Sequence, residues 1–140
     1  MRILAIDYGS KRTGIAVTDP FKIIASGLTT VPTAELFSFL KKYFSEEKVE
    51  RVVVGEPMHL DGNPSQIAPE IELFIKKMNE NWPEMPIDRE DERHTSNEAK
   101  ALILQSGLRK KDRRDKARVD KIAAALILEN YMNRTFWKSA

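Results

Sequence analysis

The sequence predicts an α/β protein built on a five-stranded mixed sheet with helices on both faces. Two observations support this prediction. Three strand-like segments joined by short turns open the chain, a pattern typical of an antiparallel meander. Helical and strand-like segments then alternate, which favours parallel strands connected by helices. The predicted order is three strands, a helix, a strand, a helix, a strand and two helices.

The predicted meander opens with an apolar run at residues 3–7 that ends at an acid, as expected for a buried strand. Residues 9–12 supply a tight turn into a second strand at residues 13–18. A third strand is predicted at about residues 23–30.

Helical periodicity begins after this meander. Aromatic and aliphatic residues recur at helical spacing from Leu36 to Phe44, and Thr33 precedes them as a candidate N-cap. A run of β-branched residues at 49–54 predicts a fourth strand. Residues 55–65 are rich in Gly, Pro and Asn, so a loop is expected there.

The second half of the chain continues the alternation of helix and strand. Apolar residues three and four apart indicate one helix, and a Thr-x-x-Glu capping box followed by a later glycine delimits another. The predicted segments are a helix around residues 71–78, a short strand centred on Ile87, a helix from the box at 95–98 to Gly107, a charged loop at 108–115 and a last helix at about 116–133.

The composition is ordinary for a globular protein and predicts a single domain over residues 1–140. Net charge is only +2, so overall charge does not by itself indicate a polyanionic partner. The absence of cysteine excludes a disulfide scaffold, a thiolate metal site and a cysteine nucleophile, and it fits a cytoplasmic location. No stretch approaches the roughly 20 apolar residues of a membrane helix, so no membrane partner is expected.

Carboxylates stand at the ends of three predicted elements. Asp7 ends the first strand, Asp91 and Glu92 end the fifth, and Asp120 opens the last helix. The carboxyl ends of parallel strands meet at one edge of a sheet, so we expect these acids to converge. Buried carboxylates need a partner or a cation, and Mg²⁺ or Mn²⁺ prefers oxygen ligands. The pattern therefore predicts a hydrolase of phosphodiester bonds that uses about two such ions.

Each acid also has a simpler structural interpretation. Asp7 is suited to start an Asx turn, and the pair at residues 91–92 to form a solvated charge run. Asp120 is suited to complement the dipole of its helix. The convergence of all three is more specific than any one of them.

The last helix is expected to hold Asp120 beside the sheet. We expect its sheet-facing stripe to leave Asp120 on the flank, pointing toward the strand ends. The predicted stripe consists of Val119, Ile122, Ala123, Leu126 and Ile127.

A basic segment precedes Asp120. Between residues 109 and 118, seven basic residues face two acidic ones, a local excess of five positive charges. This excess predicts contacts with a nucleic-acid backbone, the alternative being a solvated loop. The candidate backbone-binding residues are Lys11, Arg12, Arg93, Arg109, Lys110, Lys111, Arg113, Arg114, Lys116 and Arg118.

The loop after the fourth strand is expected at the same end of the sheet as the acids, where irregular loops tend to contact substrate. Glu56 is a candidate fourth metal ligand, the alternative being an exposed loop acid. The predicted substrate-loop residues are Gly55, Glu56, Pro57, Asp61 and Gly62.

A series of motifs spread along the chain resembles the YqgF (RuvX) family. The resemblance covers nearly the whole chain, in order. It rests on Asp7-Tyr8-Gly9, Thr13-Gly14-Ile15-Ala16-Val17, Val54-Gly55-Glu56-Pro57, Asp61-Gly62, Asp91-Glu92-Arg93 with Thr95 and Glu98-Ala99, Val119-Asp120, Ala123-Ala124 and Ile127-Leu128-Glu129.

This resemblance implies a ribonuclease-H-like fold and a nuclease. The family has been described as a Holliday junction resolvase and as a nuclease that matures the 5′ end of the 16S rRNA precursor. It implies that Asp7, Asp120 and one acid of the 91–92 pair form the catalytic metal site, with Glu92 favoured as ligand and Asp91 as the alternative. Structured RNA, the 16S precursor, is favoured over branched DNA on the resemblance alone.

Two departures from the family pattern bear on resolvase activity. The position of Glu56 is usually apolar in the family, and Ala117 stands where related junction resolvases carry a second acid. Two alternatives to the rRNA nuclease stay open, a resolvase of branched DNA and a non-catalytic nucleic-acid-binding module. Whether the protein is a monomer or a homodimer is left open as well.

Overall fold

The computed structural model of the chain describes residues 1–57, 66–91 and 116–137, with the side chains of 116–118 left out. The helix predicted at 95–107 and the charged loop at 108–115 lie outside these ranges. Within them, no helix has both the length and the apolar character needed to cross a membrane.

Five strands form one mixed sheet, as the sequence predicts. They follow the order β3-β2-β1-β4-β5 across the sheet. The first three pair antiparallel as a meander, and β1, β4 and β5 run parallel. The strands are β1 (Arg2–Asp7), β2 (Arg12–Thr18), β3 (Ala25–Pro32), β4 (Val49–Glu56) and β5 (Ile87–Asp91).

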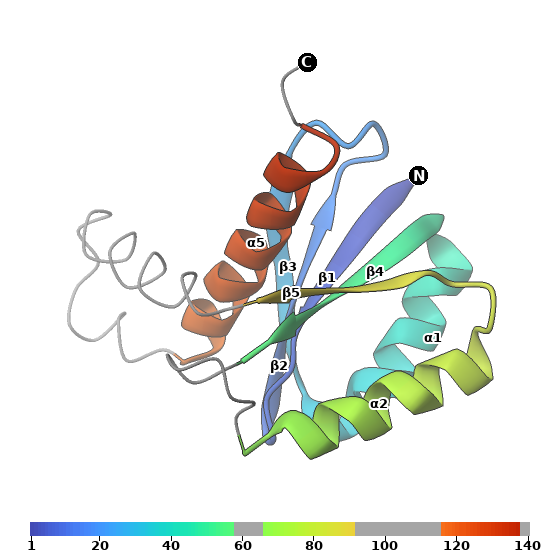
Figure 1. Ribbon diagram of the computed structural model, residues 1–140, viewed down its shortest axis with the longest axis vertical. Helices are drawn as coiled ribbons and strands as arrows, with labels where there is room; N and C mark the ends of the chain where they lie inside the picture. Colours follow the sequence, from blue (N-terminus) through green and yellow to red (C-terminus); the bar gives the residue numbers. More distant parts are fainter. Residues whose placement is uncertain (58–65, 92–115, 138–140) are drawn as a thin grey trace.

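Helices cover both faces of this sheet (Figure 1). Helices α1 and α2 lie on one face, and the long α5 lies across the other. A 3-10 turn, η1, leads directly into α1. The bounds are η1 (Thr33–Glu35), α1 (Leu36–Glu46), α2 (Ala68–Asn81) and α5 (Lys116–Arg134).

Side-chain alternation along β1 divides the interior into two cores. Leu4 and Ile6 pack with α1 and α2, whereas Ile3 and Ala5 pack with α5. All four side chains are fully buried, so the strand is covered on both faces. We call these two sides the α2 face and the α5 face of the sheet.

The buried stripe of α5 differs in phase from the predicted one. Ile122, Ala123 and Leu126 were expected to face the sheet but are only partly buried. The physical reason lies in the sheet, because glycines at positions 14 and 27 let the backbone at residues 120–121 approach and so select the face that packs. The fully or almost fully buried side chains of α5 are Ala124, Ile127, Leu128, Tyr131 and Met132.

The third strand begins two residues later than predicted because of Asp19. Its carboxylate accepts hydrogen bonds from the backbone N–H groups of Ile23 at 2.6 Å and Ile24 at 2.7 Å. This arrangement holds the segment as a turn, and the ladder with β2 starts only at Ala25.

The prediction that Thr33 caps the first helix is wrong. Residue Glu35 occupies the N-cap of α1, without a side-chain hydrogen bond. The hydroxyl of Thr33 instead donates to the carbonyl oxygen of Gly9 at 2.5 Å. The fourth strand also extends past its predicted end, because Gly55 and Glu56 pair with β5.

Candidate functional site

Asp7 lies at the end of the sheet where the parallel strands β1, β4 and β5 have their carboxyl termini. Its antiparallel neighbour on β2 is Gly14. Strand alternation puts Asp7 on the same side as Ile3 and Ala5, which pack against α5. The carboxylate of Asp7 therefore belongs to the α5 face.

Gly14 lets the first part of α5 reach this end of the sheet. A Cβ atom on Gly14 would lie 2.2 Å from the carbonyl oxygen of Asp120 and 3.3 Å from its Cβ. Any side chain at position 14 would push the helix away from the sheet. Because Gly14 pairs with Asp7 and also contacts Asp120, the two acids share one corner of the fold.

Arg12 supplies a positive charge at this corner. Its Nε donates to Oδ2 of Asp120 at 3.1 Å, and the two side chains are 39% and 25% exposed. A partly exposed ion pair contributes only about 0–1 kcal/mol. A metal cation or a phosphate can therefore compete for either partner at small cost. We refer to Asp7, Arg12, Gly14 and Asp120 as the acidic corner.

The alternation of β5 assigns Asp91 to the other side of the sheet. Asp88 and Glu90 form hydrogen bonds with residues of α5, whereas Arg89 binds a residue of α2. Continued alternation gives Asp91 to the α2 face, away from the acidic corner. Glu92, the favoured member of the pair, lies outside the described residues.

Glu56 takes part in an ion-pair cluster on the α2 face. Nη1 of Arg89 donates to Glu56 at 3.1 Å, and the same guanidinium binds both carboxylate oxygens of Glu72, one of them from Nη2 at 2.9 Å. The hydrogen bond between Arg89 and Glu72 raises the pKa of Arg89 and lowers that of Glu72. The structure thus pairs Glu56 with an arginine and does not bring it to the acidic corner.

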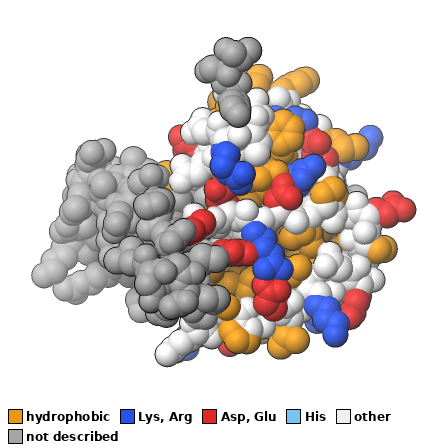
Figure 2. All heavy atoms as spheres, viewed as in Figure 1, with side chains coloured by type: hydrophobic (Ala, Val, Ile, Leu, Met, Phe, Trp, Pro, Cys, Tyr) orange, Lys and Arg blue, Asp and Glu red, His pale blue; other side chains and the backbone are white. Residues whose placement is uncertain are grey.

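Tyr131 and Arg134 anchor the second half of α5 to β5. The Tyr131 hydroxyl donates to Asp88, which also accepts from Arg51 at 2.7 Å, and Arg134 binds Glu90 at 2.7 Å. Burial and the hydrogen bond to Asp88 raise the pKa of Tyr131 to about 12. Figure 2 shows acidic and basic side chains interspersed over this side of the molecule. These contacts fix the position of α5 without using the acidic corner.

Comparison with known proteins establishes the family. The profile of RuvX, described as Holliday junction resolvase, matches residues 1–134. The chain belongs to the RuvX family.

Close relatives of this RuvX protein cover almost its full length. A protein of Christiangramia forsetii is 56% identical over 131 residues, which is 94% of this chain and 97% of the relative. One of Flavobacterium psychrophilum is 53% identical over 133 residues, which is 95% and 97% of the two chains. Both relatives carry the name "Putative pre-16S rRNA nuclease".

A solved structure shares the fold. The Holliday junction resolvase of fowlpox virus superposes with a TM-score of 0.54, covering 96% of this chain and 99% of its own at 18% identity. At this identity the likeness concerns the fold alone. It confirms the predicted ribonuclease-H-like architecture.

Asp7 and Asp120 are the residues of the acidic corner that could hold a hard divalent cation. Asp7 and Asp120 present oxygen donors, which suit Mg²⁺ or Mn²⁺. Across residues 1–57, 66–91 and 116–137, no three Asp, Glu, His or Cys side chains are grouped closely enough to hold a metal ion. The two acids fit such an ion as an incomplete set, and the third predicted acid, Glu92, is not among those ranges.

Most of the predicted backbone-binding residues lie outside the described ranges. Lys11 is exposed in the turn between β1 and β2, and Gly55 and Pro57 lie at the end of β4. For Lys116 and Arg118 the structure gives only the helix backbone. The predicted residues outside the described ranges are Asp61, Gly62, Glu92, Arg93, Arg109, Lys110, Lys111, Arg113 and Arg114.

Gly14 is a residue of the acidic corner that was not predicted to take part in the site. A glycine inside a strand signals close approach of another backbone, so the segment 13–17 carried a usable clue. What the sequence did not reveal was the approaching residue, Asp120. The pairing of Arg12 with that acid was not predicted either.

Proposed function

We propose that this protein is a metal-dependent nuclease that hydrolyses phosphodiester bonds at the acidic corner. One observation carries the proposal. Gly14 pairs with Asp7 and leaves room for Asp120. Two acids that are remote in sequence are therefore neighbours at the carboxyl end of β1. The RuvX family and the names of its relatives support the same activity.

Asp7, Asp120 and Glu92 are the proposed metal ligands, with Mg²⁺ or Mn²⁺ as the cation. When bound, such an ion activates a water molecule and neutralises charge on the phosphate. The face of Asp91 supports its neighbour Glu92 as the ligand. If Asp120 held a cation, the Arg12 guanidinium that now pairs with it would be available to the phosphate.

The rest of the substrate backbone is assigned to basic residues around this corner. Lys11 in the adjacent turn and the segment at 109–118, together with Arg93, are proposed to contact phosphates. Phosphate contacts position a nucleic acid without reading its sequence. We propose that residues 1–140 act as one nuclease domain in the cytoplasm.

The proposed substrate is the precursor of 16S rRNA, cleaved to form its 5′ end. Its support is the printed name of relatives that are 56% and 53% identical over nearly the whole chain. A second candidate is the four-way DNA junction, supported by the description of the RuvX family. Ala117, where related junction resolvases carry another acid, favours the RNA.

The test is cleavage by the wild type and by Asp7→Asn. Both are incubated in Mn²⁺ with a precursor rRNA fragment spanning the 5′ end and, separately, with a four-way junction. We expect the wild type to cut the RNA and Asp7→Asn to lose at least about 100-fold in rate, since even outer-shell metal partners are worth 10–100-fold. Glu46→Gln, an exposed change at the end of α1, is the control.

Binding separates the two outcomes. Asp7→Asn should still bind the RNA. Cleavage by Asp7→Asn at the wild-type rate would exclude this site. No cleavage by the wild type, with binding unchanged in both proteins, would make the protein a binding module. Cleavage of the junction alone would make it a resolvase.

A further inference from the structure

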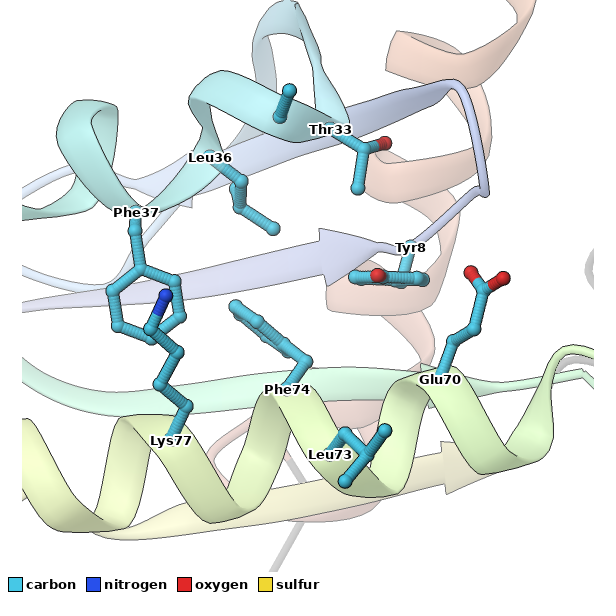
Figure 3. A pocket seen from close by; sticks show the side chains of 9 residues that line it. Tyr8, Thr33, Leu36, Phe37, Glu70, Leu73, Phe74 and Lys77 are labelled. Atoms are coloured by element: carbon cyan, nitrogen blue, oxygen red, sulfur yellow. The ribbon is translucent and has the colours of Figure 1, made fainter.

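A pocket opens on the α2 face, across the sheet from the acidic corner. It has a volume of about 350 Å³ and lies between η1, α1 and α2 (Figure 3). Tyr8, which directly follows Asp7, forms part of its wall. We propose that this pocket holds an unpaired base of the nucleic-acid substrate, with guanine preferred. The proposal rests on the proposed function, because it concerns the same substrate.

The pocket is tied to the strand end that carries Asp7. Consecutive strand residues point to opposite faces, so Asp7 serves the acidic corner while Tyr8 serves the pocket. The Thr33 hydroxyl, on the pocket wall, donates to the carbonyl oxygen of Gly9 at 2.5 Å. A strand whose phosphate sits at the acidic corner can therefore place a neighbouring base over the sheet edge and into the pocket.

Aromatic rings from three elements form the walls. The Phe74 ring lies 5.4 Å from that of Tyr8 and 5.6 Å from that of Phe37, measured between centroids. Figure 3 shows these rings along the pocket, with Leu73 beside them. Leu73 is 69% exposed and adds apolar surface at the pocket. Aromatic walls of this kind stack nucleobases whatever their sequence.

Two opposite charges flank the apolar floor. Glu70 and Lys77 are seven residues apart on α2, which is about 10.5 Å along the axis, and Figure 3 shows them on opposite sides of Phe74. Ser10 donates to Glu70 at 3.3 Å, and the Lys77 amine lies 4.3 Å from the centroid of the Phe37 ring. Both polar groups are therefore held at the pocket.

These charges fit the hydrogen-bonding edges of guanine. A carboxylate only accepts hydrogen bonds and an ammonium only donates them. Guanine presents N–H donors at N1 and N2 and acceptors at O6 and N7, so Glu70 suits the first edge and Lys77 the second. Uracil and cytosine lack the paired donors of a ring N–H beside an amine, and adenine carries an acceptor at N1. Guanine is thus the base that satisfies both residues.

The first test measures binding of short single-stranded RNAs by fluorescence anisotropy in EDTA, so that no cleavage occurs. One oligonucleotide carries a single guanine among uracils, a second has hypoxanthine there, and a third is abasic. We expect the wild type to bind the guanine form roughly tenfold more tightly than the abasic form, as one stacked base provides. Equal affinities for these two forms would overturn the proposal.

Variants then assign the effect to the pocket. Glu70→Gln should remove discrimination between guanine and hypoxanthine, which lacks the N2 amine. Ala34→Trp, at an exposed wall position, should fill the pocket and remove the guanine preference while binding of the abasic RNA stays. Glu80→Gln, exposed on α2 but not lining the pocket, is the matched control for Glu70→Gln. A guanine preference unchanged in Ala34→Trp would place the base elsewhere.

Failure of this inference can be told from failure of the nuclease proposal. If the wild type shows Mn²⁺-dependent cleavage but no base preference, the base-binding proposal for the pocket is refuted and the nuclease proposal stands. If the wild type shows a base preference but no cleavage, the base-binding proposal is supported and the nuclease proposal is refuted.

Discussion

At the carboxyl end of the parallel strands, the acids on the two faces of the sheet pair with arginine in different ways. On the α2 face, Glu56 and Glu72 share the guanidinium of Arg89, which binds one of them through both of its oxygens. On the α5 face, Asp120 meets Arg12 through a single contact beside a glycine. Both ion pairs are partly exposed, so the difference between them lies in geometry. Bidentate pairing fixes the orientation of the two groups, whereas a single contact is more easily exchanged. This contrast agrees with a structural role for Glu56 and Glu72 and with the proposed cation site at Asp7 and Asp120.

The largest expected effect separates the two acids at the end of β5. If the site belongs to the α5 face, Glu92→Gln should reduce Mn²⁺-dependent cleavage at least about 100-fold, by the same reasoning as for other metal ligands. Asp91→Asn should retain cleavage within a few-fold. Rates measured on one RNA fragment compare the two variants. A loss confined to Asp91→Asn would reverse the assignment.

The next effect concerns the contact between sheet and helix. Gly14→Ala sets a Cβ 2.2 Å from a backbone oxygen, whereas in Gly27→Ala the contact at 2.5 Å is with the flexible Lys121 side chain and the nearest backbone oxygen is 3.0 Å away. Gly14→Ala should lower the free energy of unfolding by about 1–3 kcal/mol and remove cleavage, since α5 must shift. Gly27→Ala should keep cleavage. Urea unfolding and cleavage rates measure both, and equal loss of cleavage would show that α5 packing in general, rather than the corner, matters.

Most of the fold can be predicted from the hydrophobic periodicity of the sequence, but the side of α5 that faces the sheet cannot. Strand alternation and the buried spacing of α2 were readable in the sequence, and Ile71, Phe74, Ile75 and Met78 are buried as the spacing predicts. The run at residues 122–128 is apolar on every side, so no stripe stands out. The glycines of the neighbouring strands help to select the face that packs.

The candidate site was predictable in part. The sequence correctly indicated that Asp7 and Asp91 end strands, but Asp120 follows the first turn of α5 and does not open the helix. The structure brings Asp7 and Asp120 to one corner across Gly14. The pairing of Glu56 with Arg89 and the face of Asp91 depend on strand register and on α2, which local patterns do not specify. The role of Glu92 stays a prediction.

A smaller effect is expected from the anchor between α5 and β5. Tyr131→Phe removes a hydrogen bond to Asp88 and should cost about 1–2 kcal/mol of unfolding free energy at pH 7. Urea unfolding at that pH measures the loss, and cleavage should persist. A complete loss of cleavage would mean that the anchor and the acidic corner are not separable.

The same anchor predicts how stability depends on pH. The pKa of Tyr131 is raised to about 12, so its contribution is full below the unfolded value of about 10 and is lost as pH rises through 12. For Asp88, burial raises the pKa, but hydrogen bonds from Tyr131 and Arg51 outweigh it and leave the pKa below its usual range. Its contribution is present above about pH 4 and is lost as pH falls further. Both dependences should weaken in Tyr131→Phe, measured as Tm against pH.

The smallest change in stability is expected from Arg12→Gln. Its partly exposed ion pair contributes at most about 1 kcal/mol, so the unfolding free energy should hardly move. Removing the competing guanidinium should tighten Mn²⁺ binding a few-fold in calorimetry and weaken RNA binding. Weaker Mn²⁺ binding would mean that Arg12 supports the cation site instead of competing for it.

Paramagnetic broadening of amide NMR signals by Mn²⁺ tests the cation site most directly. Added to the uniformly ¹⁵N-labelled protein, Mn²⁺ should broaden the signals of Asp7, Gly14 and Asp120 first, and the effect should vanish in Asp7→Asn. Broadening that instead centres on Glu56 and Glu72, or that persists unchanged in Asp7→Asn, would contradict the assignment of the cation to the α5 face.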